Sequence, residues 1–239
     1  MAEPDAAAGT AALSLVHLRR APRAAGAGKP PLLLLLHGVG SHERDLFSFA
    51  DAVDPRFLVL SLRAPLVRGP DSFAWFNVQF LPQGYAIEPD QLRASRDRIL
   101  AFIGEAIQAY GADAARVYLL GFSQGAIMAL TTLLSSPNAL AGITALSGRI
   151  PPEVIPWIAP QAELAGAPVL VIHGTLDAII PIDYARRARE VLQALPVDLT
   201  YIEYPLPHTI GERTLAASLA WLASHLDAPR RSPPAPDGE

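Results

Sequence analysis

Five consecutive leucines, residues 32–36, are the feature that most restricts the fold of this chain. The run is apolar at every position, so a strand built from it has to be buried on both faces of a sheet. It is far shorter than the roughly 20 residues that an apolar helix needs to cross a membrane. The leucines therefore predict a buried strand in a sheet that is covered on both faces by helices.

Short apolar runs alternate with longer segments of helical periodicity along the rest of the sequence, which is typical of a mostly parallel sheet. We predict strands at residues 13–19, 32–36, 57–61, 116–121, 141–146, 168–173 and 198–204. We predict helices near residues 43–52, 90–110, 124–136, 182–195 and 211–226. The expected fold class is α/β, with a single mostly parallel sheet of about seven strands and helices on both faces.

The length of 239 residues and the hydrophobic content of 51% suit one domain with a substantial core. We find no internal repeat and no second boundary, and we assign residues 12–227 to that domain. Residues 1–11 are rich in alanine and acids, and residues 228–239 are dominated by proline, charge and small residues. Such compositions do not build a core, so both ends are predicted to be disordered.

Charge and cysteine content exclude several classes of partner and chemistry. The net charge is −4 and the basic residues are scattered, so no nucleic acid partner is expected. The chain has no cysteine, which excludes a disulfide framework, a thiolate nucleophile and a sulfur-ligated metal site. The first residues carry acids where a secretory signal carries positive charge. We therefore expect a cytoplasmic location and no integral membrane segment.

Residues 62–89 show no clear periodicity and contain several prolines, glycines and aromatic residues. We predict a long irregular loop here. Loops of this length in compact domains are usually functional or disordered, and the aromatic residues favour a functional role.

The sequence GFSQG, residues 121–125, follows a predicted strand and precedes a predicted helix. A sharp turn between strand and helix holds the serine of such a pentapeptide in a strained conformation, and the glycines let neighbouring chains approach. The free N–H groups at the start of the helix favour an oxyanion. Ser123 is thus a candidate nucleophile, and the pentapeptide alone leaves open that it is only an N-cap serine.

A serine nucleophile needs a histidine to remove its proton and a carboxylate to orient that histidine. His208 is the candidate base, because it follows two prolines in a loop between the last predicted strand and the last helix. Asp177 is the candidate acid, because it comes just after the predicted strand 168–173, and parallel sheets gather functional groups at the carboxyl ends of strands. An exposed histidine and a turn-forming aspartate are the alternatives. The order Ser123, Asp177, His208 is that of α/β hydrolases.

The other five histidines lie in predicted strands or helices, where a structural or exposed role is expected, or too early in the chain: His17, His37, His42, His173 and His225. An acyl-transfer site also needs donors for the oxyanion of the tetrahedral intermediate. The N–H of Gln124, directly after the nucleophile, is one candidate. The N–H of Val39 in HGVG is the other, since Gly38 and Gly40 free that loop to turn its amides inward.

Residues 31 to about 226 resemble the phospholipase/carboxylesterase family of α/β hydrolases, which includes bacterial carboxylesterases and acyl-protein thioesterases. The matching segments are LLHGVGSHERDLF, RAPLVRGPDSFAWF, GFSQGAIMAL, ALSGRIP, VIHGTLDAIIPID and YPLPHTIG. The family's nucleophile, acid and base fall on Ser123, Asp177 and His208, and its oxyanion donors on the amides of Val39 and Gln124. The chain departs from the family pattern at Ala126, at Asn77 and over residues 151–166.

The resemblance implies a small serine hydrolase without a large cap domain, acting on carboxylic esters or thioesters without a cofactor or metal. Residues 73–87 are then candidates for an apolar wall around the acyl group, although such side chains can equally fill the core. The candidate substrate-binding residues in this segment are Trp75, Phe76, Phe80 and Leu81.

Several functions share this machinery, because a fold and a triad do not fix the leaving group or the acceptor. A lysophospholipase, an acyl-protein thioesterase, an acyltransferase or a peptidase could use the same residues. A non-catalytic interaction protein that keeps the fold is the alternative from another class. The expected partner is a small-molecule ester or thioester, and the sequence leaves a monomer and a homodimer equally open.

Overall fold

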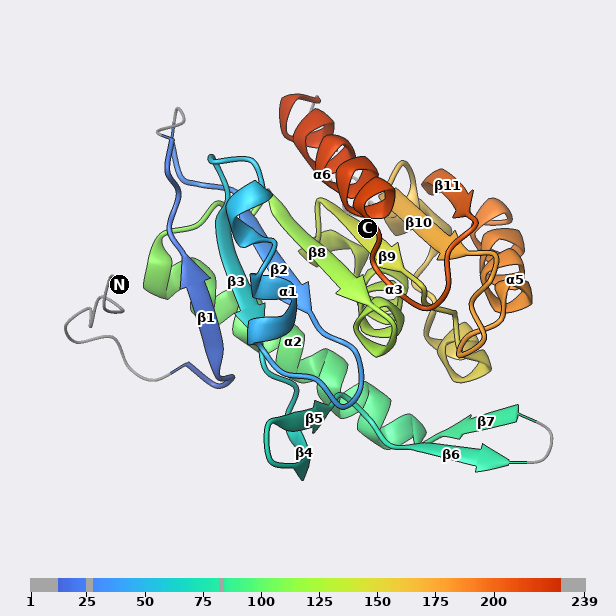
Figure 1. Cartoon of the computed structure of the whole chain (residues 1–239). Helices are drawn as coiled ribbons and strands as arrows, with labels where there is room; N and C mark the ends of the chain where they lie inside the picture. Colours follow the sequence, from blue (N-terminus) through green and yellow to red (C-terminus); the bar gives the residue numbers. More distant parts are fainter. Residues whose placement is uncertain (1–12, 25–27, 82–83, 229–239) are drawn as a thin grey trace, which may run out of the picture.

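The computed structural model describes residues 13–24, 28–81 and 84–228. Its centre is a seven-stranded sheet with the order β1-β3-β2-β8-β9-β10-β11 (Figure 1). Strand β1 is antiparallel to β3, and the other neighbours are parallel. The strands are β1 (His17–Arg20), β2 (Leu32–Leu36), β3 (Leu58–Leu62), β8 (Val117–Phe122), β9 (Gly142–Leu146), β10 (Pro168–Gly174) and β11 (Asp198–Tyr204). The prediction of a mostly parallel sheet of about seven strands is confirmed.

The five leucines of β2 serve both faces of the sheet, as their sequence predicts. Leu32, Leu34 and Leu36 pack in one core cluster, whereas Leu33 and Leu35 belong to a second cluster. All five are buried because successive side chains of a strand point to opposite faces.

Helices cover both faces (Figure 1). Helices α2 (Pro89–Tyr110), α3 (Gln124–Ser135) and α5 (Ile182–Gln193) lie on the face of the first cluster. Helices α1 (Arg44–Phe47) and α6 (Glu212–Asp227) and the 3-10 turn η1 (Ala50–Ala52) lie on the other. All five predicted helical segments are present, although the segment 43–52 divides into α1 and η1. The predicted helix at 90–110 ends at Gly111, whose φ of 65° ends the helix in the left-handed conformation.

The prediction of one irregular loop over residues 62–89 is wrong. The segment forms two hairpins, β4 (Leu66–Gly69) with β5 (Ser72–Ala74) and β6 (Val78–Leu81) with β7 (Gly84–Ile87). Asp71 has a φ of 49° in the turn of the first hairpin, a conformation that aspartate tolerates better than most residues. Both hairpins lie outside the seven-stranded sheet (Figure 1). Their strands are three or four residues long, too short for an alternating pattern to be visible in the sequence.

Residues 151–166, where the sequence departs from the family segments quoted above, are also partly regular. They contain the 3-10 helix η3 (Pro152–Trp157) and the short helix α4 (Gln161–Leu164), after the turn η2 (Pro137–Ala139) that follows α3. The predicted disorder of residues 1–11 and 228–239 falls outside the described residues, apart from Ala228.

The strand order creates a natural crevice at the carboxyl ends of β2 and β8. After β2 the chain moves to β3 on one side, whereas β8 pairs with β2 on the other side. The chain continues from β2 to β3 on one side and from β8 to β9 on the other, so the loops after these two neighbouring strands run in opposite directions. Ligands of parallel sheets bind in the crevice between two such loops. These loops begin at His37 and Ser123.

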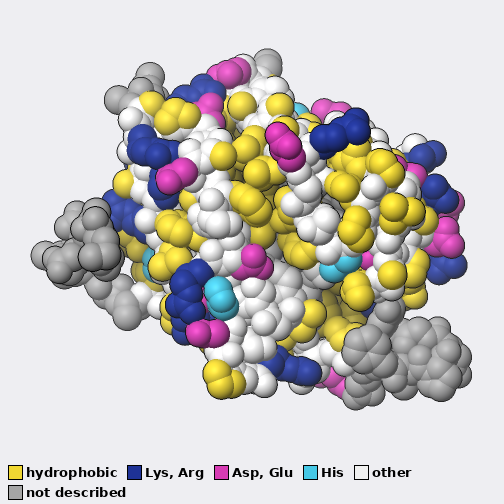
Figure 2. All heavy atoms as spheres, viewed as in Figure 1, with side chains coloured by type: hydrophobic (Ala, Val, Ile, Leu, Met, Phe, Trp, Pro, Cys, Tyr) yellow, Lys and Arg dark blue, Asp and Glu magenta, His cyan; other side chains and the backbone are white. Residues whose placement is uncertain are grey.

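The surface carries no single basic field on the face shown in Figure 2. Lysine and arginine side chains lie there in separate small groups beside aspartates and glutamates. In the part of the chain that the structure describes, no helix is both long and apolar enough to span a membrane.

Candidate active site

Ser123 lies at the turn between β8 and α3, in a backbone conformation that side-chain-bearing residues rarely adopt. Its φ is 54° and its ψ is −115°, and such a conformation costs about 1–3 kcal/mol. A Cβ at Gly121 would collide with the backbone of Gly125, and a Cβ at Gly125 would collide with the carbonyl group of Leu36. The two glycines of the pentapeptide thus let α3 approach β2 and β8 closely.

The hydroxyl of Ser123 does not cap helix α3. Ser123 occupies the N-cap position, but its side chain makes no capping hydrogen bond. Its Oγ instead lies 2.9 Å from Nε2 of His208, and its backbone N–H donates to the carbonyl oxygen of Leu146 at 2.9 Å. Of the two roles that the sequence left open, the geometry favours a hydroxyl directed at a base.

His208 lies in the loop between β11 and α6, and its ring bridges Ser123 and Asp177. Its Nδ1 lies 2.7 Å from Oδ2 of Asp177, and the ring packs against that of Phe122 with 4.9 Å between centroids. A carboxylate can only accept hydrogen bonds, so Nδ1 carries the proton and Nε2 keeps a lone pair. That lone pair can accept the proton of the serine hydroxyl.

Asp177 is held in place by the turn that follows β10. Its Oδ1 accepts hydrogen bonds from the N–H groups of Ile179 at 2.9 Å and Ile180 at 2.8 Å. Its side chain is fully buried, and buried charge has to be compensated by hydrogen bonds. These bonds leave Oδ2 directed at His208.

His173, the penultimate residue of β10, is a second histidine beside Asp177. Its Nε2–H donates to the carbonyl oxygen of Ile180 at 2.7 Å and lies 3.3 Å from Oδ2 of Asp177. Burial lowers the pKa of His173 below its usual value, so the ring is neutral. It therefore contributes a donor near the carboxylate without a competing positive charge. This placement fits the structural role that the sequence analysis expected for His173.

The loop after β2 reaches Ser123. A Cβ at Gly38 would lie 3.3 Å from Cβ of Ser123, and Gly40 turns the loop with a φ of 79°. Val39 and Gln124 both line the pocket beside Ser123. Gln124 is the first residue of α3, whose N–H has no partner within its own helix. The geometry therefore suits the predicted oxyanion donors, whose role stays a prediction.

The side chain of Gln124 has a second role that the sequence did not indicate. Its Oε1 accepts from the N–H of Trp75 at 2.7 Å, and its Nε2 donates to the carbonyl oxygen of Phe76 at 2.7 Å. The indole N–H of Trp75 donates to the carbonyl oxygen of His37 at 3.0 Å. The residue after the nucleophile thus connects the turn at Ser123 to the β5–β6 connection and to the loop after β2.

A pocket of about 210 Å³ opens beside Ser123. Most of the residues that line it are apolar, and the full set is Val39, Arg68, Phe76, Val78, Ile87, Ser123, Gln124, Ile127, Arg149, Ile179 and Ile180. Arg68 and Arg149 did not stand out in the sequence, where the arginines are scattered.

The four predicted substrate-binding residues have different positions. Phe76 lines the pocket. Trp75 is fully buried in the core and is not part of the pocket wall, because its indole N–H turns toward His37. Phe80 and Leu81 belong to β6, but their side chains lie outside the part of the structure that is described.

His37, early in the chain, is buried and structural. Its Nδ1–H donates to the carbonyl oxygen of Gly38 at 2.7 Å, and its Nε2 accepts from the N–H of Ala64 at 3.0 Å. Burial lowers the pKa of His37, which keeps the ring neutral. Among the described residues, no group of three or more histidines and acids could hold a metal ion.

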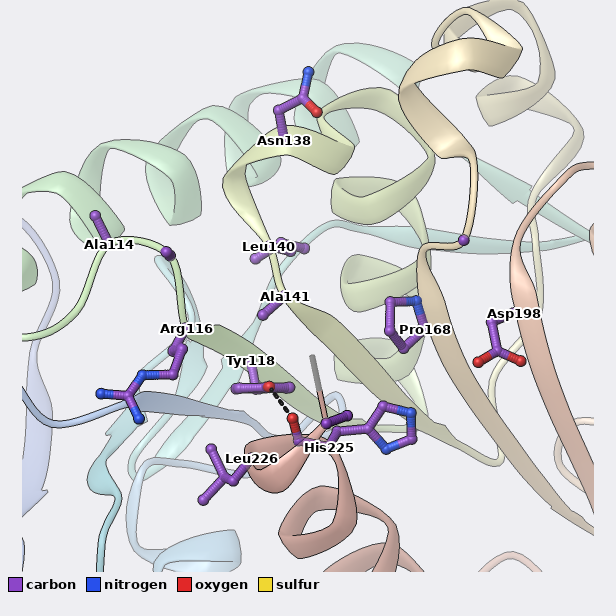
Figure 3. Close-up of a pocket in the computed structure, with 13 residues that line it drawn as sticks. Ala114, Arg116, Tyr118, Asn138, Leu140, Ala141, Pro168, Asp198, His225 and Leu226 are labelled. Atoms are coloured by element: carbon purple, nitrogen blue, oxygen red, sulfur yellow. Dashed lines mark hydrogen bonds between the residues drawn. The ribbon is translucent and has the colours of Figure 1, made fainter. Parts of the chain in front are cut away.

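A larger hollow of about 670 Å³ lies at the opposite edge of the sheet. Figure 3 shows the side chains that line it, among them Tyr118, whose hydroxyl donates to the carbonyl oxygen of His225 at 3.1 Å. Pro168 and Asp198 begin β10 and β11 there, and Ala141 directly precedes β9. These are the amino ends of the strands, whereas Ser123 and Asp177 follow carboxyl ends. The hollow therefore shares no residue with the candidate active site.

Comparisons with known proteins agree on one family. The family model described as Phospholipase/Carboxylesterase matches residues 24–226. The Escherichia coli protein named esterase YpfH is 30% identical over 197 residues, which are 79% of this chain and 80% of the relative. Acyl-protein thioesterase 1 of Eremothecium gossypii is 28% identical over 67% of this chain and 68% of that protein. The crystal structure of the Bacillus cereus carboxylesterase matches with a TM-score of 0.74 and 25% identity, covering 89% of this chain and 95% of that one.

Proposed function

The chain belongs to the phospholipase/carboxylesterase family of α/β hydrolases and is a carboxylesterase-like hydrolase, and from this premise we propose that Ser123, His208 and Asp177 form its catalytic triad. One observation carries the proposal: the hydrogen-bonded chain from Asp177 through His208 to Ser123, with distances of 2.7 and 2.9 Å. This row of hydrogen-bonded side chains leads to Ser123, which lines an apolar pocket large enough for a small acyl group.

In the proposed reaction, His208 accepts the hydroxyl proton as Oγ of Ser123 attacks the carbonyl carbon of the ester. The tetrahedral intermediate collapses, the bond to the leaving oxygen breaks, and His208 donates its proton to the departing alcohol. A water molecule then attacks the acyl-enzyme with His208 again as base, which releases the acid and restores Ser123. Asp177 orients the ring and stabilises its charged form.

The backbone N–H groups of Val39 and Gln124 are the proposed oxyanion donors. One such donor is worth about 3 kcal/mol of transition-state stabilisation in a water-excluded site. Gln124 is held by its bonds to Trp75 and Phe76, and this fixed geometry supports the assignment because preorganised donors need no rearrangement during the reaction.

Thioesters are the second candidate substrates. The observation in their favour is the similarity to acyl-protein thioesterase 1. A thiol leaving group can use the same triad, because its departure needs no additional residue.

We also propose that residues 12–227 form one hydrolase domain and that the protein acts in the cytoplasm.

Labelling with a fluorophosphonate probe and hydrolysis of a panel of esters and thioesters of graded acyl length test this function. The variant Ser123→Ala should not be labelled and should lose at least about a thousandfold in kcat, because nothing replaces the nucleophile. Ser224→Ala on α6 is the control and should behave as the wild type, because the Ser224 hydroxyl donates to the carbonyl oxygen of Trp221 and does not line the pocket.

The proposed triad fails if Ser123→Ala keeps its activity, or if folded wild-type protein is not labelled at Ser123. The second result would favour an interaction protein that keeps the fold without the chemistry.

A further inference from the structure

Trp75 lies between the two segments that carry the proposed oxyanion donors. It directly follows β5, and its side chain is fully buried. Its indole N–H donates to the carbonyl oxygen of His37 at 3.0 Å, in the loop that contains Val39. Its backbone N–H donates to Oε1 of Gln124 at 2.7 Å. One residue therefore contacts both sides of the proposed oxyanion site, although it does not line the pocket itself.

The ring of His37 extends this contact to the peptide that carries the Val39 N–H. Nε2 of His37 accepts from the N–H of Ala64 at 3.0 Å, so the proton of the neutral ring is on Nδ1. That Nδ1–H donates to the carbonyl oxygen of Gly38 at 2.7 Å. The carbonyl oxygen of Gly38 and the N–H of Val39 belong to one planar trans peptide and point in opposite directions. The ring thus fixes the direction of the Val39 N–H.

The loop after β2 is docked on β5 in a way that leaves the N–H of Val39 available. The N–H of Gly40 donates to the carbonyl oxygen of Phe73 at 2.8 Å, and the N–H of Phe73 donates to that of Ser41 at 2.9 Å. Within the part of the chain that the structure describes, the N–H of Val39 donates to no backbone carbonyl group. The loop is therefore held by the residues around Val39 and not by Val39 itself.

We propose that Trp75 is a positioning residue that, together with the ring of His37, holds the N–H of Val39 and the N–H of Gln124 in the arrangement that binds one oxyanion. This inference rests on the proposed esterase function and adds to it the residues that preorganise the oxyanion site. Two donors on separate loops stabilise an oxyanion only if both are aimed at it before the reaction begins. A buried indole N–H needs an acceptor, and here the acceptor belongs to the loop of the other donor.

The variant Trp75→Phe removes the indole N–H and keeps an aromatic ring and the backbone N–H that binds Gln124. We expect kcat/KM for ethyl butyrate, measured by pH-stat titration, to fall about 10- to 100-fold, because a small displacement of an oxyanion donor costs about this much. The effect should lie in the stabilisation of the oxyanion and not in the binding of the uncharged substrate, since Trp75 does not line the pocket.

Two ketones separate these two effects. With propyl trifluoromethyl ketone, Oγ of Ser123 adds to the carbonyl carbon, the hydroxyl proton passes to His208, and the former carbonyl oxygen becomes an oxyanion. Methyl propyl ketone has a similar shape but is far less electrophilic, so its inhibition constant reports the pocket alone. In Trp75→Phe the inhibition constant of the trifluoromethyl ketone should rise in parallel with the loss of kcat/KM. That of the methyl ketone should change less than about threefold.

Trp221→Phe is the matched control for the loss of an indole. Trp221 lies in α6 and packs in the cluster on the other face of the sheet, and it does not line the pocket. Its variant measures the general effect of replacing a large core side chain by a smaller one. It should lose stability in urea unfolding and keep the wild-type kcat/KM and both inhibition constants.

A second pair of variants tests the ring of His37 and does not depend on the folding of Trp75→Phe. The amide nitrogen of asparagine can take the place of Nδ1, and the amide oxygen of glutamine can take the place of Nε2. His37→Asn therefore keeps the donor to Gly38, whereas His37→Gln keeps only the acceptor for Ala64. We expect His37→Gln to lose about 10- to 100-fold in kcat/KM and His37→Asn to stay within about threefold of the wild type. Equal activity of the two variants would overturn the role given to the ring.

The inference is overturned if Trp75→Phe keeps the wild-type kcat/KM, or if it weakens both ketones equally, since the pocket as a whole would then be disturbed. Failure of the proposed function gives a different result. In that case Ser123→Ala keeps its activity, and the wild type binds the trifluoromethyl ketone no more tightly than the methyl ketone.

Discussion

At the scale of single residues, the backbone of Ser123 is held in a strained conformation that lowers local stability and directs the hydroxyl to His208. A residue with a Cβ at a φ of 54° and a ψ of −115° is strained, and its hydroxyl does not recover the cost by capping α3. The hydroxyl contacts His208 instead. The turn is held by its surroundings, including the bond from the N–H of Ser123 to Leu146.

Replacing Ser123 with glycine should therefore remove activity and relieve strain at the same time. We expect the free energy of unfolding of Ser123→Gly to exceed that of Ser123→Ala by about 1 kcal/mol, since both lose the hydroxyl but only glycine tolerates this conformation. Urea unfolding of the two variants measures the difference. Equal stability of the two, or a more stable alanine variant, would show that the turn is not strained.

At the scale of elements, the position of α3 depends on the absence of a single methyl group. Gly125 in the first turn of α3 faces the carbonyl group of Leu36 at the end of β2, where a Cβ would collide with the backbone. A similarly close fit accommodates Ala126, where the chain departs from the family pattern. A Cβ at Gly148 would lie 2.6 Å from the Cβ of Ala126, so only a glycine fits opposite this alanine.

We predict that Gly125→Ala separates α3 from β2 and disturbs the turn that presents Ser123. Because backbone atoms cannot yield as a flexible side chain can, we expect a loss of about 2 kcal/mol or more in the free energy of unfolding. Activity should fall as well, since Gln124 and Ser123 move with the start of the helix. Gly104→Ala on α2 is the control, because a Cβ there meets no atom within 4 Å, and it should not destabilise the protein.

A wild-type stability of Gly125→Ala in urea unfolding would contradict this account of the close approach. The comparison with Gly104→Ala separates a steric effect from the general effect of placing alanine in a helix.

At the scale of the whole molecule, buried titratable groups couple stability to pH. Burial lowers the pKa values of His37 and His173 in the folded protein, so below pH about 6.5 the unfolded chain binds protons that the folded chain does not. Hydrogen bonds from Arg63 lower the pKa of Glu43 from 4.5 to about 2. The stabilisation from Glu43 is complete above pH 4.5 and is lost as the pH falls toward 2. Both effects act in the same direction.

We therefore expect the free energy of unfolding to fall as the pH drops below 6.5 and to fall more steeply below 4.5. The Glu43 part should amount to about 3 kcal/mol between pH 4.5 and 2, since its side chain is only 4% exposed and its pair with Arg63 is little screened. Urea unfolding between pH 7.5 and 2.5 measures this. In Glu43→Gln the loss below pH 4.5 should be smaller by this amount, and the remaining loss comes from other carboxyl groups whose pKa is lowered in the folded protein, such as Asp54.

Asp51→Asn is the control for the acid range, because Asp51 pairs with Arg23 on the exposed surface. This variant should keep the wild-type pH profile, as exposed ion pairs contribute little. If Glu43→Gln and wild type lose stability in parallel below pH 4.5, the pair with Arg63 does not have the importance assigned to it.

The sequence by itself determined the layered α/β architecture, the positions of six of the seven sheet strands and the candidates Ser123, Asp177 and His208, whereas the first strand, predicted at 13–19, is His17–Arg20. These features depend on local information: apolar runs such as residues 32–36, helical periodicity, and turn residues at strand ends. Chain order and the carboxyl-end rule then suffice to suggest which loops meet.

Only the tertiary structure decided which side chains actually meet and which way they point. The hydrogen bonds of His208 to Ser123 and Asp177 join positions 85 and 31 residues apart. Only the tertiary structure likewise shows that Trp75 turns into the core, that residues 62–89 form two hairpins, and that Arg149 lines the pocket. Such contacts depend on strand register and on packing between distant segments, which no local pattern of residues records.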